Sequence, residues 1–197
     1  MNAHPHPYPY PTLRPMFDEL RGQRVLVRPY RETDAEELFQ AIIASRDSLL
    51  PWMPFAGAYE SVEDAREFVN RCIAHWRLRE DFTVGMWDVA SGRYVGSTGL
   101  HPRNWDIPMF EISYWLRRDA EGHGYVTEAV RLLTHYAFAS LGAARVFIRC
   151  DARNGRSAAT AARAGFPLEG RLRRDRIAYD GVLGDTLIYA LTPEHPR

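Results

Sequence analysis

The sequence of 197 residues contains no lysine. All 25 of its basic side chains are arginine, and they balance 25 acidic side chains to a formal net charge of zero. Schiff-base enzymes, pyridoxal-phosphate enzymes and P-loop nucleotidases each need a lysine amine at the centre of their chemistry. The absence of lysine therefore excludes all three of these enzyme classes.

Cysteine, net charge and long apolar runs are scarce as well. The two cysteines, Cys72 and Cys150, are too few for a disulfide framework. A neutral chain is poorly suited to general nucleic-acid binding, which depends on neutralising many phosphates. The sequence contains no run of about 18 apolar residues, the length needed to cross a membrane, and it does not begin like a signal peptide. We therefore expect a cytoplasmic protein that has neither a nucleic acid nor a membrane as its partner.

The chain is long enough for one folded domain, and 46% of its residues are apolar. Residues 1–15 repeat proline and histidine, and proline occurs too often there for a helix or a central strand. We expect an extended or disordered arm over these residues. Residues 16–197 are expected to form a single domain, because no internal repeat or linker divides them.

Hydrophobic periodicity and turn residues predict a mixed α/β fold. The expected strands span residues 24–29, 82–89, 93–100, 109–116 and 145–150, with two more between residues 166 and 192. Four helices are expected. The first begins near residue 34, and the second runs from a cap at residue 61 to about residue 79. The third carries an apolar stripe over residues 126–137, and the fourth spans residues 154–164. This order predicts a central mixed, mostly antiparallel sheet flanked by helices.

A glycine-rich loop follows the expected strand 109–116 and precedes a helix. Gly122 and Gly124 would expose backbone N–H groups at the positive end of that helix, where a phosphate can bind. Two glycines can also simply form a strand-to-helix turn. The loop is neither a dinucleotide fingerprint, because Thr127 stands where the third glycine belongs, nor a Walker loop, which needs lysine.

A second segment, residues 153–166, follows the expected strand 145–150. The glycine loop, the downstream Asn154 and a Gly-Phe pair eleven residues after it together resemble the GNAT superfamily of acetyl-CoA N-acyltransferases, from about Gly22 to the end. Many members carry a tyrosine seven residues after that asparagine, where this chain has Ala161. Ser157 lies one turn earlier on the same helical face. With the segments Glu-Ile-x-Tyr-Trp-Leu and Leu-Pro-Trp-Met-Pro, this resembles the ribosomal-protein alanine and serine N-acetyltransferases.

The resemblance implies a splayed sheet, acetyl-CoA as the cofactor, and direct attack by a primary amine in a ternary complex. The family usually has glutamine or arginine where this chain has Asp119, so Arg117 or Arg118 is expected to contact the anion instead. The arginine-rich stretch 145–176, with nine arginines against three acidic residues, is assigned to the coenzyme phosphates rather than to a solvated face. The implied cofactor-binding residues are Tyr114, Trp115, Leu116, Arg117, Arg118, Gly122, His123, Gly124, Tyr125, Val126, Thr127, Asn154, Ser157 and Arg163.

Two residues are candidates for the proton transfers of this reaction. Glu111 is the candidate base, and the alternative is a carboxylate in a structural ion pair. Ser157 is the candidate acid that protonates the leaving sulfur, and the alternative is a hydroxyl bonded to a helix carbonyl. Four side chains in loops are expected to wall the acceptor pocket, although aromatic residues are more often core: these are Trp52, Phe55, His101 and Trp105.

The acceptor implied by the resemblance is the α-amine of a protein N-terminus. Small amines (an antibiotic, an amino acid or a polyamine), a non-catalytic acyl-CoA-binding module and an unrelated nucleotide-binding protein stay open as alternatives. Family members are often dimers, so a homodimer is an expectation. No metal site is expected, because Cys72 and His75 lie one helical turn apart without a second pair of ligands.

The absence of lysine leads to the first testable prediction. An N-acetyltransferase without lysine cannot acetylate its own side-chain amines. Intact-protein mass spectrometry after incubation with acetyl-CoA should therefore show at most one added acetyl group, on the N-terminal amine. Stable acetylation at any other position would contradict this prediction.

Overall fold

The computed structural model describes residues 10–193. Residues 1–9 of the expected arm lie outside the described residues. The described part of the arm is not extended throughout, because Pro11–Leu13 form a short 3-10 helix, η1. Arg14, directly after it, is only 6% exposed, and its guanidinium lies 4.3 Å from the ring centroid of Trp105. This part of the arm is thus packed against the domain.

One eight-stranded sheet forms the centre of the molecule, in the order β1-β2-β3-β4-β5-β6-β8-β7. Its neighbouring strands pair antiparallel except for the parallel pair β5–β6, which confirms the predicted mixed, mostly antiparallel sheet. The strands are β1 (Leu20–Arg21), β2 (Val25–Pro29), β3 (Phe82–Asp88), β4 (Tyr94–Asn104), β5 (Met109–Leu116), β6 (Arg145–Asp151), β7 (Leu168–Ile177) and β8 (Leu183–Leu191).

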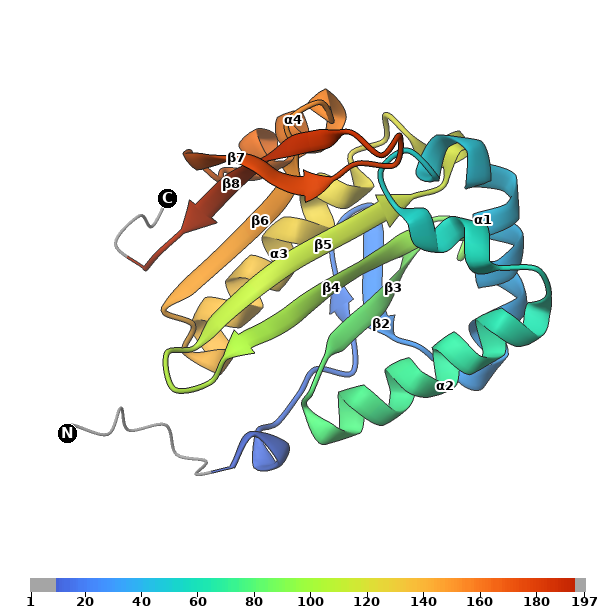
Figure 1. The fold of residues 1–197 in the computed structure, drawn as a ribbon. Helices are drawn as coiled ribbons and strands as arrows, with labels where there is room; N and C mark the ends of the chain where they lie inside the picture. Colours follow the sequence, from blue (N-terminus) through green and yellow to red (C-terminus); the bar gives the residue numbers. More distant parts are fainter. Residues whose placement is uncertain (1–9, 194–197) are drawn as a thin grey trace.

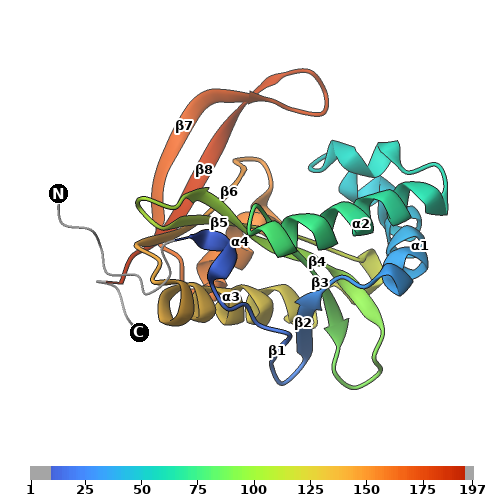
Figure 2. The ribbon, with the colours of Figure 1, turned by 90° about the horizontal axis from the view of Figure 1, so that it is seen from below.

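Helices cover both faces of this sheet (Figures 1 and 2). The helices α3 and α4 pack on one face, and α1 and α2 pack on the other. The helices are α1 (Ala35–Leu49), α2 (Val62–Leu78), α3 (Tyr125–Leu141) and α4 (Gly155–Ala164), with the short 3-10 helices η2 (Glu32–Asp34), η3 (Pro54–Ala58) and η4 (Arg118–Ala120). Within residues 10–193, none of the helices is both long and apolar enough to pass through a membrane.

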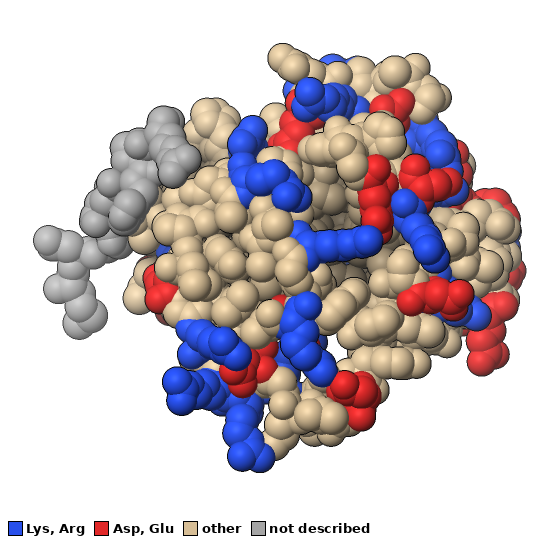
Figure 3. All heavy atoms as spheres, turned by 90° about the horizontal axis from the view of Figure 1, so that it is seen from above, with Lys and Arg blue, Asp and Glu red and all other residues tan. Residues whose placement is uncertain are grey.

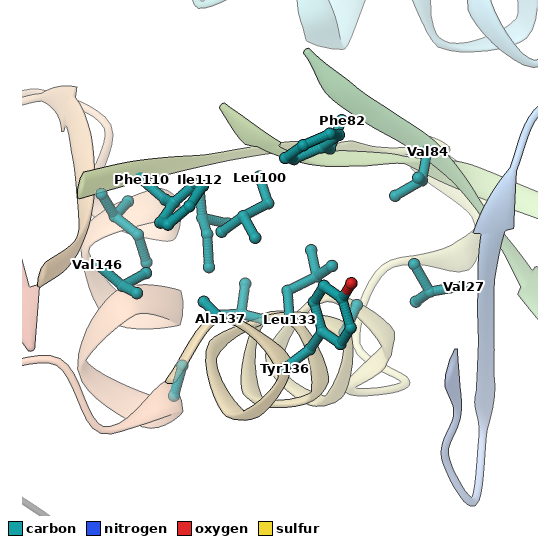
Figure 4. Packing of buried hydrophobic residues seen from close by; sticks show 14 of the residues in the cluster. Val27, Phe82, Val84, Leu100, Phe110, Ile112, Leu133, Tyr136, Ala137 and Val146 are labelled. Carbon is teal, nitrogen blue, oxygen red and sulfur yellow. The ribbon is translucent and has the colours of Figure 1, made fainter. Parts of the chain in front are cut away.

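The larger core lies between α3 and the sheet. Leu133 and Ala137 face Phe110 and Ile112 of β5 there, and all four side chains are almost completely buried (Figure 4). The helical spacing of the apolar residues in α3 provides this buried stripe. A second core on the opposite face joins α1 and α2 to the sheet, and Trp115 of β5 belongs to it. Alternate residues of β5 therefore serve different cores.

The sheet splays between β5 and β6. The two strands pair only at Met109 with Arg145, Phe110 with Val146 and Glu111 with Phe147. Beyond Glu111, β5 stays paired with β4 as far as Leu116, while β6 stays paired with β8 as far as Asp151. The edge of β5 that faces β6 is therefore unpaired after Glu111, as the splayed sheet implied by the resemblance requires.

Candidate active site

A groove of about 1400 Å³ opens where β5 and β6 separate. Its walls come from the ends of these two strands, the glycine-rich loop with the start of α3, the face of α4, and the segment between α1 and η3. Of the residues expected to bind the cofactor, those that line the groove are Tyr114, Trp115, Leu116, Gly122, Gly124, Tyr125, Val126, Thr127, Asn154, Ser157 and Arg163.

The glycine loop has the backbone geometry of an anion site. Gly122 and Gly124 have φ angles of 85° and 79°, the left-handed region that glycine adopts without strain. Gly124 precedes the first turn of α3, whose N–H groups have no partner within the helix. These groups lie at the positive end of the helix dipole, beside the groove. The loop can therefore hold a phosphate group.

Arg24 joins this loop, and the sequence analysis missed it. The carboxylate of Glu128 in α3 accepts hydrogen bonds from the backbone N–H groups of Gln23 (2.8 Å), Arg24 (2.9 Å) and Val25 (3.1 Å). These bonds hold the turn between β1 and β2 against the first turn of α3. Arg24 thereby lines the groove beside Gly124. No local pattern could reveal this, because Arg24 and Gly124 are a hundred positions apart.

The arginine-rich stretch lines the groove and also forms ion pairs, and three of its groove arginines do both: Arg149 with Glu111, Arg156 with Glu121 and Arg176 with Asp151. Four of its nine arginines line the groove: Arg149, Arg156, Arg163 and Arg176. Others are paired elsewhere, for example Arg145 with Glu169, Arg153 with Asp180 and Arg171 with Asp185. Figure 3 shows basic side chains around a hollow on this side of the molecule, with acidic side chains close to several of them. Only part of the stretch can therefore meet an anion in the groove.

Three expected cofactor residues lie outside the groove lining. Arg117 donates two hydrogen bonds to the carboxylate of Asp119, at 3.0 and 3.2 Å, and Arg93 binds the same carboxylate. Arg118 is bound through its backbone N–H to Ser45. His123 stacks its ring on Tyr125, with centroids 5.6 Å apart. Arg117 and Arg118 therefore do not line the groove, whereas Arg24 does, and contact of Arg117 or Arg118 with the anion stays a prediction.

A bridge of hydroxyl groups crosses the groove between β5 and α4. The hydroxyl of Tyr114 donates to the Ser157 carbonyl at 3.0 Å and lies 3.1 Å from the Ser157 hydroxyl. Asn154 caps α4 by accepting the Ser157 N–H at 3.0 Å. Burial raises the pKa of Tyr114 to about 12, so its phenol stays protonated at neutral pH. Because the single phenol proton of Tyr114 goes to the Ser157 carbonyl, the Tyr114 oxygen is left to accept a hydrogen bond from the Ser157 hydroxyl.

Glu111 forms structural ion pairs, as the alternative to a catalytic base supposed. Its carboxylate is 2.9 Å from Arg103 of β4 and 3.5 Å from Arg149 of β6, and the side chain is only 12% exposed. Glu111 occupies the last paired position of β5 before the splay, and it does not line the groove. Its carboxylate is thus engaged by two guanidinium groups from the neighbouring strands, as in the structural alternative, and its role as the base stays a prediction.

Of the four expected acceptor residues, only Trp52 lines the groove. Phe55 lies behind it, with its ring 6.3 Å from Trp115. Trp105 packs on the larger core, 5.3 Å from Phe110, because it faces away from the groove. His101 is hydrogen-bonded to two side chains and is considered below. Trp105 therefore does not line the groove, and its packing is that of the aromatic-core alternative.

Comparison with known proteins identifies the family. Residues 24–167, most of the chain, match the acetyltransferase (GNAT) domain family. The chain belongs to the GNAT acetyltransferases. A GNAT acetyltransferase takes acetyl-CoA as its acyl donor, and this cofactor prediction is confirmed.

Individual relatives of this GNAT acetyltransferase include proteins named for ribosomal substrates. It is 31% identical over 180 residues to a Bacillus subtilis (strain 168) protein named "Putative ribosomal N-acetyltransferase YdaF", over 89% of this chain and 95% of that protein. It is 28% identical over 163 residues to the ribosomal-protein-serine acetyltransferase of Escherichia coli (strain K12), over 77% and 85%. The structure of Mycobacterium smegmatis RimJ in complex with CoA-disulfide matches with a TM-score of 0.77 at 25% identity, over 88% and 84% of the two chains.

The groove of this GNAT acetyltransferase fits acetyl-CoA. The glycine loop, Arg24 and the groove arginines suit the phosphates, because guanidinium groups and helix N-termini both bind phosphate oxygens. The unpaired edge of β5 beyond Glu111 offers N–H and C=O groups to an extended, amide-containing arm. The hydroxyl of Ser157 lies in the same groove, 3.1 Å from the hydroxyl of Tyr114 on β5.

Asp119 provides a prediction about pH. Hydrogen bonds from Arg117, then from Arg93, hold the pKa of Asp119 at about 2 instead of 3.8. A lowered folded-state pKa stabilises the protein above the unfolded pKa, and this contribution is lost as the pH falls from about 4 to about 2. Asp119→Asn should lower the free energy of unfolding at pH 7 by less than about 1 kcal/mol, because the side chain is 53% exposed.

The difference between Asp119→Asn and the unchanged protein should then shrink as the pH falls, measured by urea unfolding at several pH values from 7 to 3. Asp47→Asn, an exposed change on α1, is the control and should show no such trend. A difference that grows toward low pH would contradict the assignment.

Proposed function

We propose that this acetyltransferase moves the acetyl group to the α-amine of a protein N-terminus, with ribosomal proteins as the substrate class. The observation that carries this proposal is the acceptor side of the groove, where α1 and the segment before η3 contribute Ser48, Leu49, Trp52 and Met53. This wall contains no carboxylate, so it is unsuited to a polycationic amine. An uncharged, largely apolar wall suits the first residues of a peptide, and relatives named for ribosomal proteins support this class.

The residues along the groove supply the remaining chemistry. The acetyl thioester offers an acyl group to the amine, without a covalent intermediate on the enzyme. Backbone N–H groups on the unpaired edge near Tyr114 and Trp115 are suited to bind the carbonyl oxygen as it gains negative charge. Ser157 donates a proton to the departing sulfur, and the neighbouring Tyr114 oxygen, 3.1 Å away, helps to orient the Ser157 hydroxyl. Asn154 keeps Ser157 in place by capping α4.

The proposed substrate implies a location. Ribosomal proteins are made in the cytoplasm, so the proposal includes a cytoplasmic enzyme. The homodimer expected from the family remains a prediction.

The acceptor class is tested by a screen for release of free coenzyme A thiol. The acceptors are synthetic peptides with N-terminal serine, alanine or threonine, the same peptides with a blocked N-terminus, and small amines that include polyamines and amino acids. We expect release with free N-terminal peptides and little with blocked peptides or polyamines. Preferential release with a small amine would replace the acceptor class. Binding of acetyl-CoA with no release for any amine would support a non-catalytic acyl-CoA-binding module.

The role of Ser157 is tested by substitution. Ser157→Ala should lower kcat about 100-fold or more, because general acid catalysis typically contributes that much. The KM for acetyl-CoA should change little, since the α4 cap uses the backbone N–H of residue 157 and not its hydroxyl. Ser140→Ala, an exposed change on α3, is the matched control and should leave kcat unchanged. An unchanged kcat in Ser157→Ala would show that another group protonates the sulfur.

A further inference from the structure

Three side chains form a hydrogen-bonded chain on the face of the sheet that α1 and α2 cover. The carboxylate of Asp81, just before β3, lies 2.7 Å from Nδ1 of His101 on β4. Nε2 of His101 lies 2.6 Å from the hydroxyl of Ser113 on β5. The Asp81 end is partly buried, whereas Ser113 is exposed. His101 is the most buried of the three, at 15% side-chain exposure against 30% for Asp81, and Ser113 forms the open end.

The chemistry of these groups fixes the direction of their hydrogen bonds. An ionised carboxylate can only accept, so the proton of a neutral His101 ring must be on Nδ1. Burial raises the pKa of Asp81. Hydrogen bonding and charge attraction from His101, together with hydrogen bonds from Thr83, lower it by more, so the pKa of Asp81 is below its usual value. Asp81 therefore stays ionised at neutral pH. Nε2 of His101 is left as a free acceptor, and the Ser113 hydroxyl donates to it.

A glycine makes room for this arrangement. The ring of His101 lies across position 99 of its own strand, where a Cβ on Gly99 would be 2.6 Å from Cε1 and 2.7 Å from Nε2 of the ring. Gly99 is the register partner of Ser113, so its missing side chain lets the ring reach across to that serine. Any larger residue would displace the ring from the serine.

The open end of the chain lies beside the groove. Ser113 alternates with Glu111 and Trp115 on the same face of β5. Glu111 is the last residue paired with β6, and Trp115 lines the groove, so Ser113 lies on the edge that the splay has just exposed. Ser113 does not itself line the groove; it is exposed, and its chain neighbour Tyr114 does line the groove. Its hydroxyl therefore lies beside the groove, on the face of the sheet that α1 and α2 cover.

We propose that Ser113 and His101 remove the proton that the acceptor ammonium must lose before it attacks, with Asp81 as the residue that positions His101. The proposal rests on the acetyltransferase function above. Ser113 takes one proton from the ammonium and passes its own to Nε2 of His101. The neutral amine then forms a bond to the acetyl carbon as the carbon–sulfur bond breaks. The second proton leaves the nitrogen for the sulfur through Ser157. His101 finally releases its proton to solvent, so the balance is one amide, one thiol and one proton.

The charged groups around His101 allow this role. Its register partner Glu111 is neutralised by Arg103 and Arg149, so no free guanidinium from β4 or β6 opposes a positive ring. On α2, the thiol of Cys72 lies near Asp81. Burial raises the pKa of this thiol to about 12, so the thiol stays uncharged. The charged group in direct contact with the ring is then the Asp81 carboxylate, 2.7 Å from Nδ1.

The test compares His101→Gln, Ser113→Ala and Asp81→Asn, with His135→Gln on the exposed side of α3 as the matched control. The assay is transfer to whichever amine the screen identifies, from pH 6 to pH 9. We expect kcat/KM of His101→Gln to fall about 100-fold or more at pH 6.5. The loss should shrink toward pH 9, because an α-amine titrates near pH 8 and there needs no base. The dissociation constant of acetyl-CoA, measured by calorimetry, should stay within about twofold.

Two further measurements separate this role from a structural one. Proton NMR should show a downfield Nδ1–H signal from the His101–Asp81 bond that is absent in His101→Gln and Asp81→Asn. Added imidazole should restore part of the activity of His101→Ala. A pH-independent loss in His101→Gln, without rescue by imidazole, would overturn the proposal, as would unchanged kcat/KM. An acetyl adduct on Ser113 would replace it by a covalent route.

Failure of the proposed function gives a different result. If the unchanged enzyme prefers a small amine, the acceptor class is wrong and the three variants are measured on that amine. If the unchanged enzyme transfers to no amine at all, both proposals are overturned. Glu111→Gln should not reproduce the pH-dependent loss of His101→Gln, and if it does, Glu111 is the base instead.

Discussion

The site depends on the loss of backbone pairing between β5 and β6 beyond Glu111 and Phe147. Each strand keeps its ladder with its other neighbour, so neither can close the gap without giving up bonds that it already makes. An interior strand edge with unpaired N–H and C=O groups costs free energy. An extended ligand that pairs with this edge gains that free energy back, which explains why a coenzyme with amides in its arm suits this groove.

Where β5 and β6 separate, called the fork here, side-chain contacts replace the missing backbone hydrogen bonds. Glu111 on β5 reaches Arg149 on β6 at the point of separation, and further along Tyr114 reaches Ser157 on α4. These contacts set how far β5 and the β6–α4 unit stand apart. The width of the groove is therefore maintained by polar side chains that also border the reaction, so changes there affect binding and stability together.

The order of the helices and of the longer strands and the position of the glycine loop could be predicted, because each depends on residues close in sequence. The packing of Trp105 could not, because a loop aromatic gives no local sign of which face it packs against. Arg24 and the chain from Asp81 to Ser113 were missed for a related reason. Hydrogen bonds to Glu128 of α3 bring Arg24 to the loop, and the pairing of β4 with β5 brings His101 to Ser113, so no local spacing rule can reveal either contact.

Two carboxylates, Glu111 and Asp81, differ in the side chain that each one binds, and this difference decides their roles. Glu111 is shared by two guanidinium groups, Arg103 of β4 and Arg149 of β6, so its carboxylate joins the two neighbouring strands. Asp81 meets an imidazole instead, and a proton placed on His101 strengthens their bond while Asp81 stays charged. The base that we propose at this fork is therefore an imidazole backed by a carboxylate. The arginines that bind Glu111 also join the strands at the fork.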